Sequence, residues 1–364
     1  MVICLVDDLG HGGVQSNNPH VLGPKVQALQ DAGVYLSRSY VYKYCSPTRG
    51  SLLSGRYPFR LGNTRSNFIP WSVRDGLQLG FDTVRRHAAP QRCCAGAGAR
   101  AARADTPRSL QLPLRLKRYK YANHHVGKWH LGFYNSSFLP VNRGFDSFFG
   151  YLTGETDHFT ETVGTGFLKG CGASTVDLTS DATPARGRNG SYSGTMYGEE
   201  AVAVIKAHAA KQQQHQAQHQ TQEETQEQAQ TPLFLNFWLQ STHGPFEVPA
   251  KYKNLYKFED AKLNTFNGMV SVVDEAVGNV TAALKVRTII RIPPAAMNSL
   301  SNLFCSPFSA SLVLKATGLW SNTWVVYTQD NGAPLGGGGS NFPFRGGKNS
   351  NFEVLAGHCH LSRP

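Results

Sequence analysis

One short segment, residues 45–56, carries the side chains best suited to covalent chemistry. Cys45 is followed at two-residue intervals by Pro47 and Arg49. Proline fits the first turn of a helix, where its missing N–H is not needed, so a helix is expected to begin just after Cys45. The N-terminus of that helix favours negative charge at residue 45, and Arg49 adds a permanent cation. The spacing favours a nucleophile at Cys45, although by itself it also fits a buried free cysteine before an ordinary helix.

Two acidic segments offer oxygen ligands to a hard metal ion. Asp7 and Asp8 follow an apolar run at the start of the chain, and Asp330 and Asn331 follow a β-branched run near its end. Carboxylate and amide oxygens suit Ca²⁺ or Mg²⁺ better than zinc. Taken singly, each segment is also an ordinary turn signal.

Basic side chains stand in three further segments. Lys128 and His130 follow one apolar run, and His243 follows another. Lys348 lies in the segment Arg-Gly-Gly-Lys. A cation can neutralise an anionic substrate, and an imidazole with a pKa of about 6.5 can donate a proton at mildly acidic pH. A lone histidine or lysine is more often structural or on the surface, so these residues gain meaning only together.

The elements that must position these residues alternate between short apolar runs and helical stretches, which favours an α/β architecture. Strands are expected at residues 1–6, 121–126, 232–239 and 323–328, and helices at 25–32, 47–53, 197–211 and 267–284. The polar residues lie just beyond the carboxyl ends of the expected strands. Open α/β sheets place their ligand sites at that edge.

The order and spacing of these chemically active segments resemble those of the sulfatase family. Residues 45–56 match its Cys-x-Pro-x-Arg signature, and 127–132 match a second signature, although Lys120 stands where the family usually has glycine. Further family blocks are matched at 241–243 and 345–348. The resemblance is strongest to the arylsulfatase B type, N-acetylgalactosamine-4-sulfatase and its near relatives, through the segments 143–151, 268–284 and 341–346.

The resemblance implies the fold of the alkaline-phosphatase superfamily, a three-layer α/β sandwich around a mixed, mostly parallel sheet. We expect residues 1–353 to form the sulfatase catalytic domain and 354–364 to be an unrelated tail. A glutamine-rich stretch, 211–230, reads as a solvated insertion or a frayed helix end. The smaller C-terminal subdomain of the family is expected to be missing.

The resemblance also implies the chemistry: hydrolysis of a sulfate ester of a sugar or an aryl group. Cys45 would be converted to formylglycine, whose hydrate attacks sulfur. One Ca²⁺ would be bound by Asp7, Asp8, Asp330, Asn331 and the modified residue 45. Arg49 and His130 would hold and deprotonate the second hydroxyl at residue 45, which expels sulfate and regenerates the aldehyde. Lys128 and Lys348, with Ca²⁺, would neutralise the sulfate oxygens. His243 would protonate the leaving oxygen.

Three segments depart from the family pattern, at 82–119, 286–315 and 354–364. The second interrupts an otherwise continuous family block, with a lysine on either side, Lys285 and Lys315. We expect these segments to come from an imperfect gene model that also lacks its true start and C-terminal part. A divergent family member with real surface insertions is the open alternative.

Charge and composition exclude several other classes. The net charge is +12, but the windows 82–120 and 285–315 contain the whole excess and show no nucleic-acid recognition pattern, so nucleic acid is not an expected partner. Seven scattered cysteines without a Cys-x-x-Cys pair argue against structural zinc. No stretch approaches the roughly 20 apolar residues that span a bilayer.

Two alternatives remain beside the sulfatase prediction. Some phosphodiesterases and phosphonate hydrolases of the same superfamily share Cys-x-Pro-x-Arg, and an inactive pseudo-sulfatase from a defective gene is the other. Through the resemblance we expect a secretory-pathway protein, lysosomal or extracellular, matured by the formylglycine-generating enzyme, although no signal peptide opens the chain. Glycosylation sequons at Asn135, Asn189 and Asn279 would matter only in that compartment.

Overall fold

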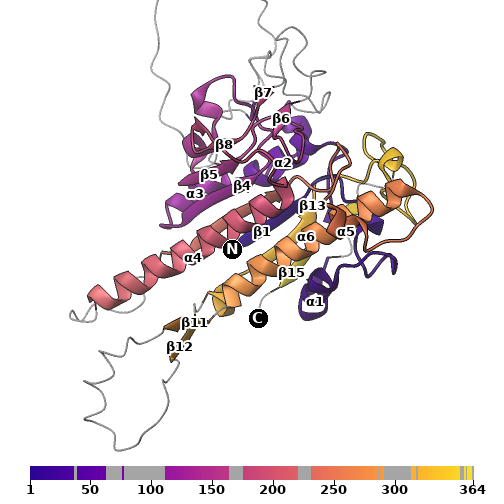
Figure 1. The fold of residues 1–364 in the computed structure, drawn as a ribbon. Coiled ribbons are helices and arrows are strands. Elements are labelled where there is room, and N and C mark those ends of the chain that lie inside the picture. The colour runs from indigo at the N-terminus through magenta and orange to yellow at the C-terminus, as the bar shows by residue number, and fades with distance from the viewer. Residues whose placement is uncertain are drawn as a thin grey trace, which may run out of the picture.

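The computed structural model describes residues 1–36, 39–62, 76–77, 111–163, 175–219, 231–285, 287–290, 313–316, 319–352, 356–357 and 359–362. Among these, nine strands form the central sheet: β1 (Val2–Val6), β2 (Val34–Tyr35), β4 (Ala122–Gly127), β5 (Ser147–Gly150), β8 (Thr179–Ser180), β9 (Thr183–Pro184), β10 (Leu233–Leu239), β13 (Val325–Gln329) and β15 (Cys359–Ser362). Their order across the sheet is β2-β15-β13-β1-β10-β4-β5-β8-β9 (Figure 1).

The middle of the sheet is parallel and its margins are antiparallel. β13, β1, β10, β4 and β5 run in one direction. β15 and β2 on one side, and β8 and β9 on the other, pair antiparallel. This is the mixed, mostly parallel sheet that the sequence predicts.

Helices cover both faces, which makes three layers. Along β1, Val2, Cys4 and Val6 pack in the core beneath α1 (Pro24–Ala32), α4 (Ser193–His219) and α6 (Ala261–Lys285). The alternate residues Ile3 and Leu5 pack in the opposite core, with α2 (Cys45–Ser54) and α3 (Leu112–Lys117). Because successive side chains of a strand point to opposite faces, an apolar strand such as β1 supplies both cores. Figure 1 shows α4 and α6 side by side on their face of the sheet.

Short elements complete the described structure. They are the strands β3 (Ser39–Tyr40), β6 (Thr162–Val163), β7 (Thr175–Val176), β11 (Arg287–Ile290), β12 (Val313–Ala316) and β14 (Ala356–Gly357), the helix α5 (Ala250–Lys253), and the 3-10 turns η1 (His11–Gly13), η2 (Pro58–Arg60), η3 (Ser136–Phe138), η4 (Pro140–Arg143), η5 (Trp320–Asn322) and η6 (Leu335–Gly337). None of the helices in this part of the chain is both long enough and apolar enough to cross a bilayer.

The expected elements are all found, and three helices are longer than predicted. α2 begins at Cys45 itself, and α6 begins six residues early, where Asp260 accepts a hydrogen bond from the backbone N–H of Lys262. α4 runs on to His219, so part of the glutamine-rich stretch is helical; glutamine is a good helix former. Residues 220–230 lie outside the described structure.

The segments that depart from the family pattern are partly built into the fold. α3 lies within 82–119, and Gln111 just before it accepts a hydrogen bond from buried Arg143 at 3.1 Å. In 286–315, β11 pairs antiparallel with β12. In the expected tail, β15 pairs with β13 and so covers the edge of the parallel strands. Residues 82–110, 291–312 and 353–355 lie outside the described structure.

A buried acid beneath the sheet, Glu161, connects stability to pH. It is only 2% exposed and accepts a hydrogen bond from the Tyr197 hydroxyl at 3.0 Å. Burial raises the pKa of Glu161 from 4.5 to about 8, and nearby Asp177 acts in the same direction. The folded chain therefore keeps a proton that the unfolded chain releases above pH 4.5.

Because the folded state binds the extra proton, the stability of the wild type is expected to fall as pH rises from about 4.5 to about 8. Glu161→Gln removes this titration and can still accept from Tyr197. The free energy of unfolding of the variant minus that of wild type should be about 2–3 kcal/mol larger at pH 7.5 than at pH 5, so the variant is relatively more stable at the higher pH. Urea denaturation at both pH values measures this, with exposed Glu199→Gln as control. An equal difference at both pH values would contradict it.

Candidate active site

The parallel strands end in register, and this brings the polar residues that follow them together. Val6 of β1 lies opposite Leu239 of β10 and Gln329 of β13. Backbone hydrogen bonds then link the loops: the Thr242 N–H donates to the Asp7 carbonyl at 2.7 Å, and the Asp330 N–H donates to the Val6 carbonyl at 3.2 Å. The expected site thus lies at the carboxyl edge of the sheet.

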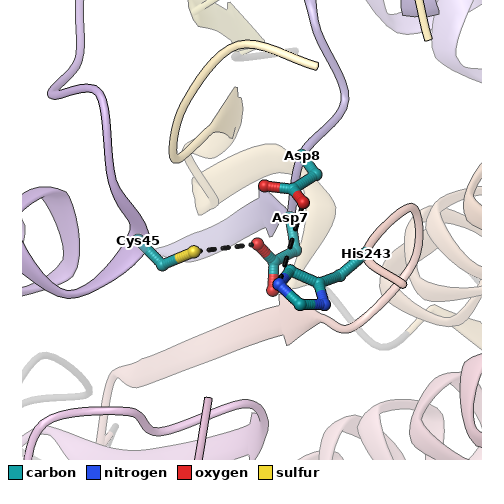
Figure 2. Close-up of side chains that lie close together, drawn as sticks. All are labelled: Asp7, Asp8, Cys45 and His243. Carbon is teal, nitrogen blue, oxygen red and sulfur yellow. Dashed lines mark hydrogen bonds and ion pairs between the residues drawn. The ribbon is translucent and has the colours of Figure 1, made fainter. Parts of the chain in front are cut away.

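Cys45 lies at the first position of α2, fully buried, and its thiol donates a hydrogen bond to Asp7 Oδ1 at 3.4 Å (Figure 2). Burial, together with the nearby carboxylates of Asp330 and Asp7, raises the pKa of this thiol. The thiolate is the reactive form of cysteine, so an unmodified Cys45 is a poor nucleophile in spite of the helix terminus.

Arg49, one turn into α2, is fully buried and holds the acidic residues in place. Its Nε and Nη2 donate to Asp330 Oδ2 at 3.1 and 2.7 Å, and its Nη1 donates to the Lys128 carbonyl at 3.2 Å. The guanidinium also lies 5.1 Å above the Trp238 ring. This planar, multiply bonded group ties α2, β4 and β13 to one another.

Lys128 and His130 follow β4 through a tight turn. Gly127 has φ 102°, and a Cβ there would lie 1.9 Å from the Trp238 carbonyl oxygen, so only glycine fits. The turn directs the Lys128 ammonium to Asp7 Oδ2 at 2.5 Å. Burial, with Lys128 and Arg49, holds the pKa of His130 well below its usual range, so His130 is neutral.

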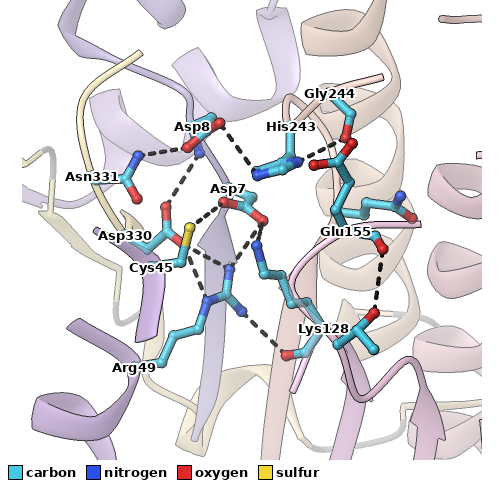
Figure 3. A network of polar contacts seen from close by, with 12 residues as sticks. Asp7, Asp8, Cys45, Arg49, Lys128, Glu155, His243, Gly244, Asp330 and Asn331 are labelled. Carbon is cyan, nitrogen blue, oxygen red and sulfur yellow. Dashed lines mark hydrogen bonds and ion pairs between the residues drawn. The ribbon is translucent and has the colours of Figure 1, made fainter. Parts of the chain in front are cut away.

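His243 and Lys348 complete the cluster from two further loops. Figure 3 shows the His243 ring beside Asp8. Lys348 Nζ donates to Asp8 Oδ2 at 2.8 Å, and His243 Nε2 lies 3.7 Å from the same oxygen. The Nδ1–H of His243 donates to the Gly244 carbonyl at 2.7 Å. The imidazole of His243 does not have the ordinary pKa of about 6.5 that the sequence leads one to expect. Burial, with Lys128 and Lys348, lowers that pKa to about 4.

The cluster contains ligand atoms that could hold a metal ion. Asn331 donates through Nδ2 to Asp8 Oδ1 at 2.6 Å, while its Oδ1 is buried without a partner in the described part of the chain. Ligand atoms of Asp7, Asp8, Cys45 and His243 all lie within 4.8 Å of one another. Burial would raise the pKa of Asp7, but Lys128, His243 and Arg49 hold it well below the usual range, so the carboxylate is ionised. Residues expected from the sequence to bind metal and those expected to be catalytic are all brought together.

A loop that the sequence analysis missed, residues 152–158, lies against both histidines. A Cβ at Gly154 would lie 2.8 Å from the His130 ring, and His158 Nε2 donates to the His243 carbonyl at 3.0 Å. The loop also carries Glu155, whose side chain points toward His243 (Figure 3). It directly follows β5, so its place at the carboxyl end of another strand was the available signal.

Comparison with known proteins identifies the family. The family model described as Sulfatase matches residues 1–289, well over half of the chain. The chain belongs to the sulfatase family. It is 28% identical to mouse (Mus musculus) arylsulfatase J over 355 residues, which cover 97% of this chain and 46% of that protein. It is 26% identical to mouse N-acetylgalactosamine-6-sulfatase, covering 97% of this chain and 55% of the relative. These matches support the sulfatase family and do not single out the arylsulfatase B type.

Solved structures show the same fold. The crystal structure of Ps i-CgsB in complex with k-i-k-neocarrahexaose has a TM-score of 0.71 and 20% identity, and the match covers all of this chain and 65% of that one. PsFucS1 sulfatase from Pseudoalteromonas sp. has a TM-score of 0.60 and 18% identity, with 61% of that chain covered. The sulfatase chain described here therefore spans about half the length of its curated relatives and shares the three-layer fold.

The buried ion pair of Arg49 with Asp330 provides a test of the site's architecture. Arg49→Ala leaves a buried carboxylate without its partner, and the free energy of unfolding should fall by about 3–5 kcal/mol. The matched control is Lys117→Ala, which breaks the exposed ion pair with Asp146 and should cost about 1 kcal/mol or less. Urea denaturation measures both variants. Equal losses would show that the buried network does not hold these loops together.

Proposed function

We propose that this chain hydrolyses sulfate esters at Cys45, after that residue has been converted to formylglycine. The observation that carries the proposal is the convergence of three buried or nearly buried cations, Arg49, Lys128 and Lys348, around one cysteine at a helix N-terminus. Such a group suits a small anion with several oxygens. Because the pKa of the Cys45 thiol is raised, little of it would be in the reactive thiolate form, so attack on sulfur would need the conversion to formylglycine. Once formed, the hydrated formylglycine supplies the hydroxyl that attacks sulfur.

The oxygen ligands Asp7, Asp8, Asp330 and Asn331 would hold one Ca²⁺ next to residue 45. The buried, unpartnered Oδ1 of Asn331 supports this, because an amide oxygen in such a place needs a donor or a cation. Bound calcium supplies positive charge that attracts the sulfate and stabilises charge on its oxygens.

The remaining residues bind the ester and move protons. Lys128 and Lys348 would bind sulfate oxygens by charge-assisted hydrogen bonds. His130, neutral because its pKa is lowered, would accept the proton of the second hydroxyl at residue 45, with Arg49 holding that residue in place. Loss of that proton would break the bond between the carbon of residue 45 and the transferred sulfate, so sulfate would leave and the aldehyde would re-form. His243 would donate a proton to the leaving oxygen. Lys128 and Lys348 help to lower the His243 pKa, and a bound anionic ester would offset their charge. The His243 pKa would then rise when substrate binds, so that more of the imidazole carries the proton to be donated.

The substrate is a sulfated carbohydrate or an aryl sulfate, as the names of the relatives suggest. The resemblance to the sulfatase relatives favours a secretory location, lysosomal or extracellular, and maturation by a formylglycine-generating enzyme, and both are part of the proposal. The three sequon asparagines, Asn135, Asn189 and Asn279, are all exposed, which suits glycosylation. Every residue expected at the site is present in the cluster, and this favours an active sulfatase over an inactive one.

Replacing the modified residue tests the reaction. The full chain, co-expressed with a formylglycine-generating enzyme, should release 4-nitrophenol from 4-nitrophenyl sulfate. Cys45→Ala should lower kcat by at least about 10³-fold, because the nucleophile is lost. Bis(4-nitrophenyl) phosphate, assayed in parallel, should be the poorer substrate. Sulfatase activity retained in Cys45→Ala would refute the mechanism, and a preference for the phosphate diester would favour a phosphodiesterase.

Calcium binding can be tested without turnover. A ligand that binds only the folded state at 100 times its Kd stabilises by about 2.7 kcal/mol, so added CaCl₂ should raise the Tm of the Cys45→Ala chain by several degrees. Asp8→Asn in the same background should abolish most of this rise, whereas Asp31→Asn, which changes an exposed acid on α1, should not. An equal rise in all three chains would mean that calcium binds elsewhere.

A further inference from the structure

Among the acids of the site, Glu155 is the one whose carboxyl group has no partner in the part of the chain that the structure describes. The three aspartates each have a cation: Asp7 is bonded by Lys128, Asp330 by Arg49 and Asp8 by Lys348. Glu155, by contrast, has neither a hydrogen bond nor an ion pair to its carboxyl oxygens in the described ranges. It is partly exposed, so a ligand can reach it.

The backbone that carries Glu155 is held firmly in position. The Asp177 carboxylate accepts hydrogen bonds from the backbone N–H groups of Leu152 and Thr153, at 2.8–3.1 Å. On the other side, Gln240 Nε2 donates to the Thr156 carbonyl at 2.6 Å. The Thr153 hydroxyl donates to the carbonyl of Glu155 itself at 3.2 Å. A polar group held this way, without a protein partner at its tip, is typical of a ligand contact.

The place of Glu155 shows which part of a ligand it would meet. Its side chain points toward His243, the residue proposed to face the leaving oxygen (Figure 3). It also lies near Lys128 and Lys348: partial burial raises the pKa of Glu155, and those two lysines act against this effect. A sulfate held by the lysines would therefore place the alcohol part of the ester beside Glu155.

We infer that Glu155 determines specificity for the leaving group, by accepting a hydrogen bond from a hydroxyl or amide N–H next to the sulfated carbon. The favoured substrate class is the sulfate ester of a neutral sugar. A hexuronate is disfavoured, because its carboxylate would be brought close to that of Glu155. The inference rests on the proposed function and deepens it.

The test compares leaving groups with and without hydrogen-bond donors. The full chain carrying formylglycine is assayed with 4-nitrophenyl sulfate, with N-acetylgalactosamine sulfated at O4 or O6, and with a 2-sulfated hexuronate. Wild type should prefer a neutral amino sugar to the hexuronate. Glu155→Ala should lower kcat/KM for that sugar by about 10- to 100-fold, mainly through KM, and this loss should exceed the loss on 4-nitrophenyl sulfate by at least tenfold.

Two further variants separate charge from shape. Glu155→Gln keeps an acceptor oxygen and loses the charge, so it should recover part of the activity on the neutral sugar and weaken the discrimination against the hexuronate. Glu199→Gln, an exposed acid on α4, should leave all the ratios unchanged. The inference is wrong if Glu155→Ala lowers kcat/KM equally for every substrate, or leaves kcat/KM for the neutral sugar unchanged. It is also wrong if wild type prefers the hexuronate. In each of these cases the proposed sulfatase function stands. If wild type turns over none of the sulfate esters, the proposed function is wrong, and this inference is wrong with it.

Discussion

Asp7 has no exposed surface, yet its carboxylate is ionised, because the charges of Lys128 and Arg49 more than offset the cost of burial. Each group around it comes from a different element: Arg49 from α2, Lys128 from the turn after β4, and Asp330 from the loop after β13. A buried charge tolerates little displacement of its partners, since an unpaired ion in such a place is costly. The balance of charge around Asp7 therefore fixes where these loops can lie.

The sheet makes this balance possible. Five parallel strands end at the same level, so residues more than 300 positions apart, such as Asp8 and Asp330, meet through a direct contact of 3.2 Å. The two apolar cores on either side need only alternating side chains from strands such as β1 and β10. Packing thus provides rigid supports, and the loops at the carboxyl edge carry the residues of the candidate site.

Much of this could be predicted from the sequence, because the informative signals are local. Apolar runs followed by polar residues located β1, β4, β10 and β13, and the expected site residues converge as predicted. Other features depend on contacts between residues that are distant in the sequence. β15 joins the sheet because β13 presents an open edge. The low pKa of His243 depends on burial and on Lys128 and Lys348, each more than 100 residues away along the chain. The loop at 152–158 escaped notice because β5 is only four residues long.

Charge also links the proposed metal to the proposed substrate. By formal charge, Arg49, Lys128 and Lys348 are three cations and Asp7, Asp8 and Asp330 are three acids, so the cluster is balanced when all six are ionised. Burial and the neighbouring Asp7 raise the pKa of Asp330 to about 7, so this acid is the one that most needs its Arg49 partner or a bound cation. The lysines and a bound cation compete for the same carboxylate oxygens, and a lysine released from an aspartate can bind a sulfate oxygen instead. Binding of the cation and of the anion should then favour each other, as linkage requires. Under the proposed function, the three aspartates would therefore have a second role beyond holding the loops in place, because sharing them with a cation would free the lysines for the sulfate.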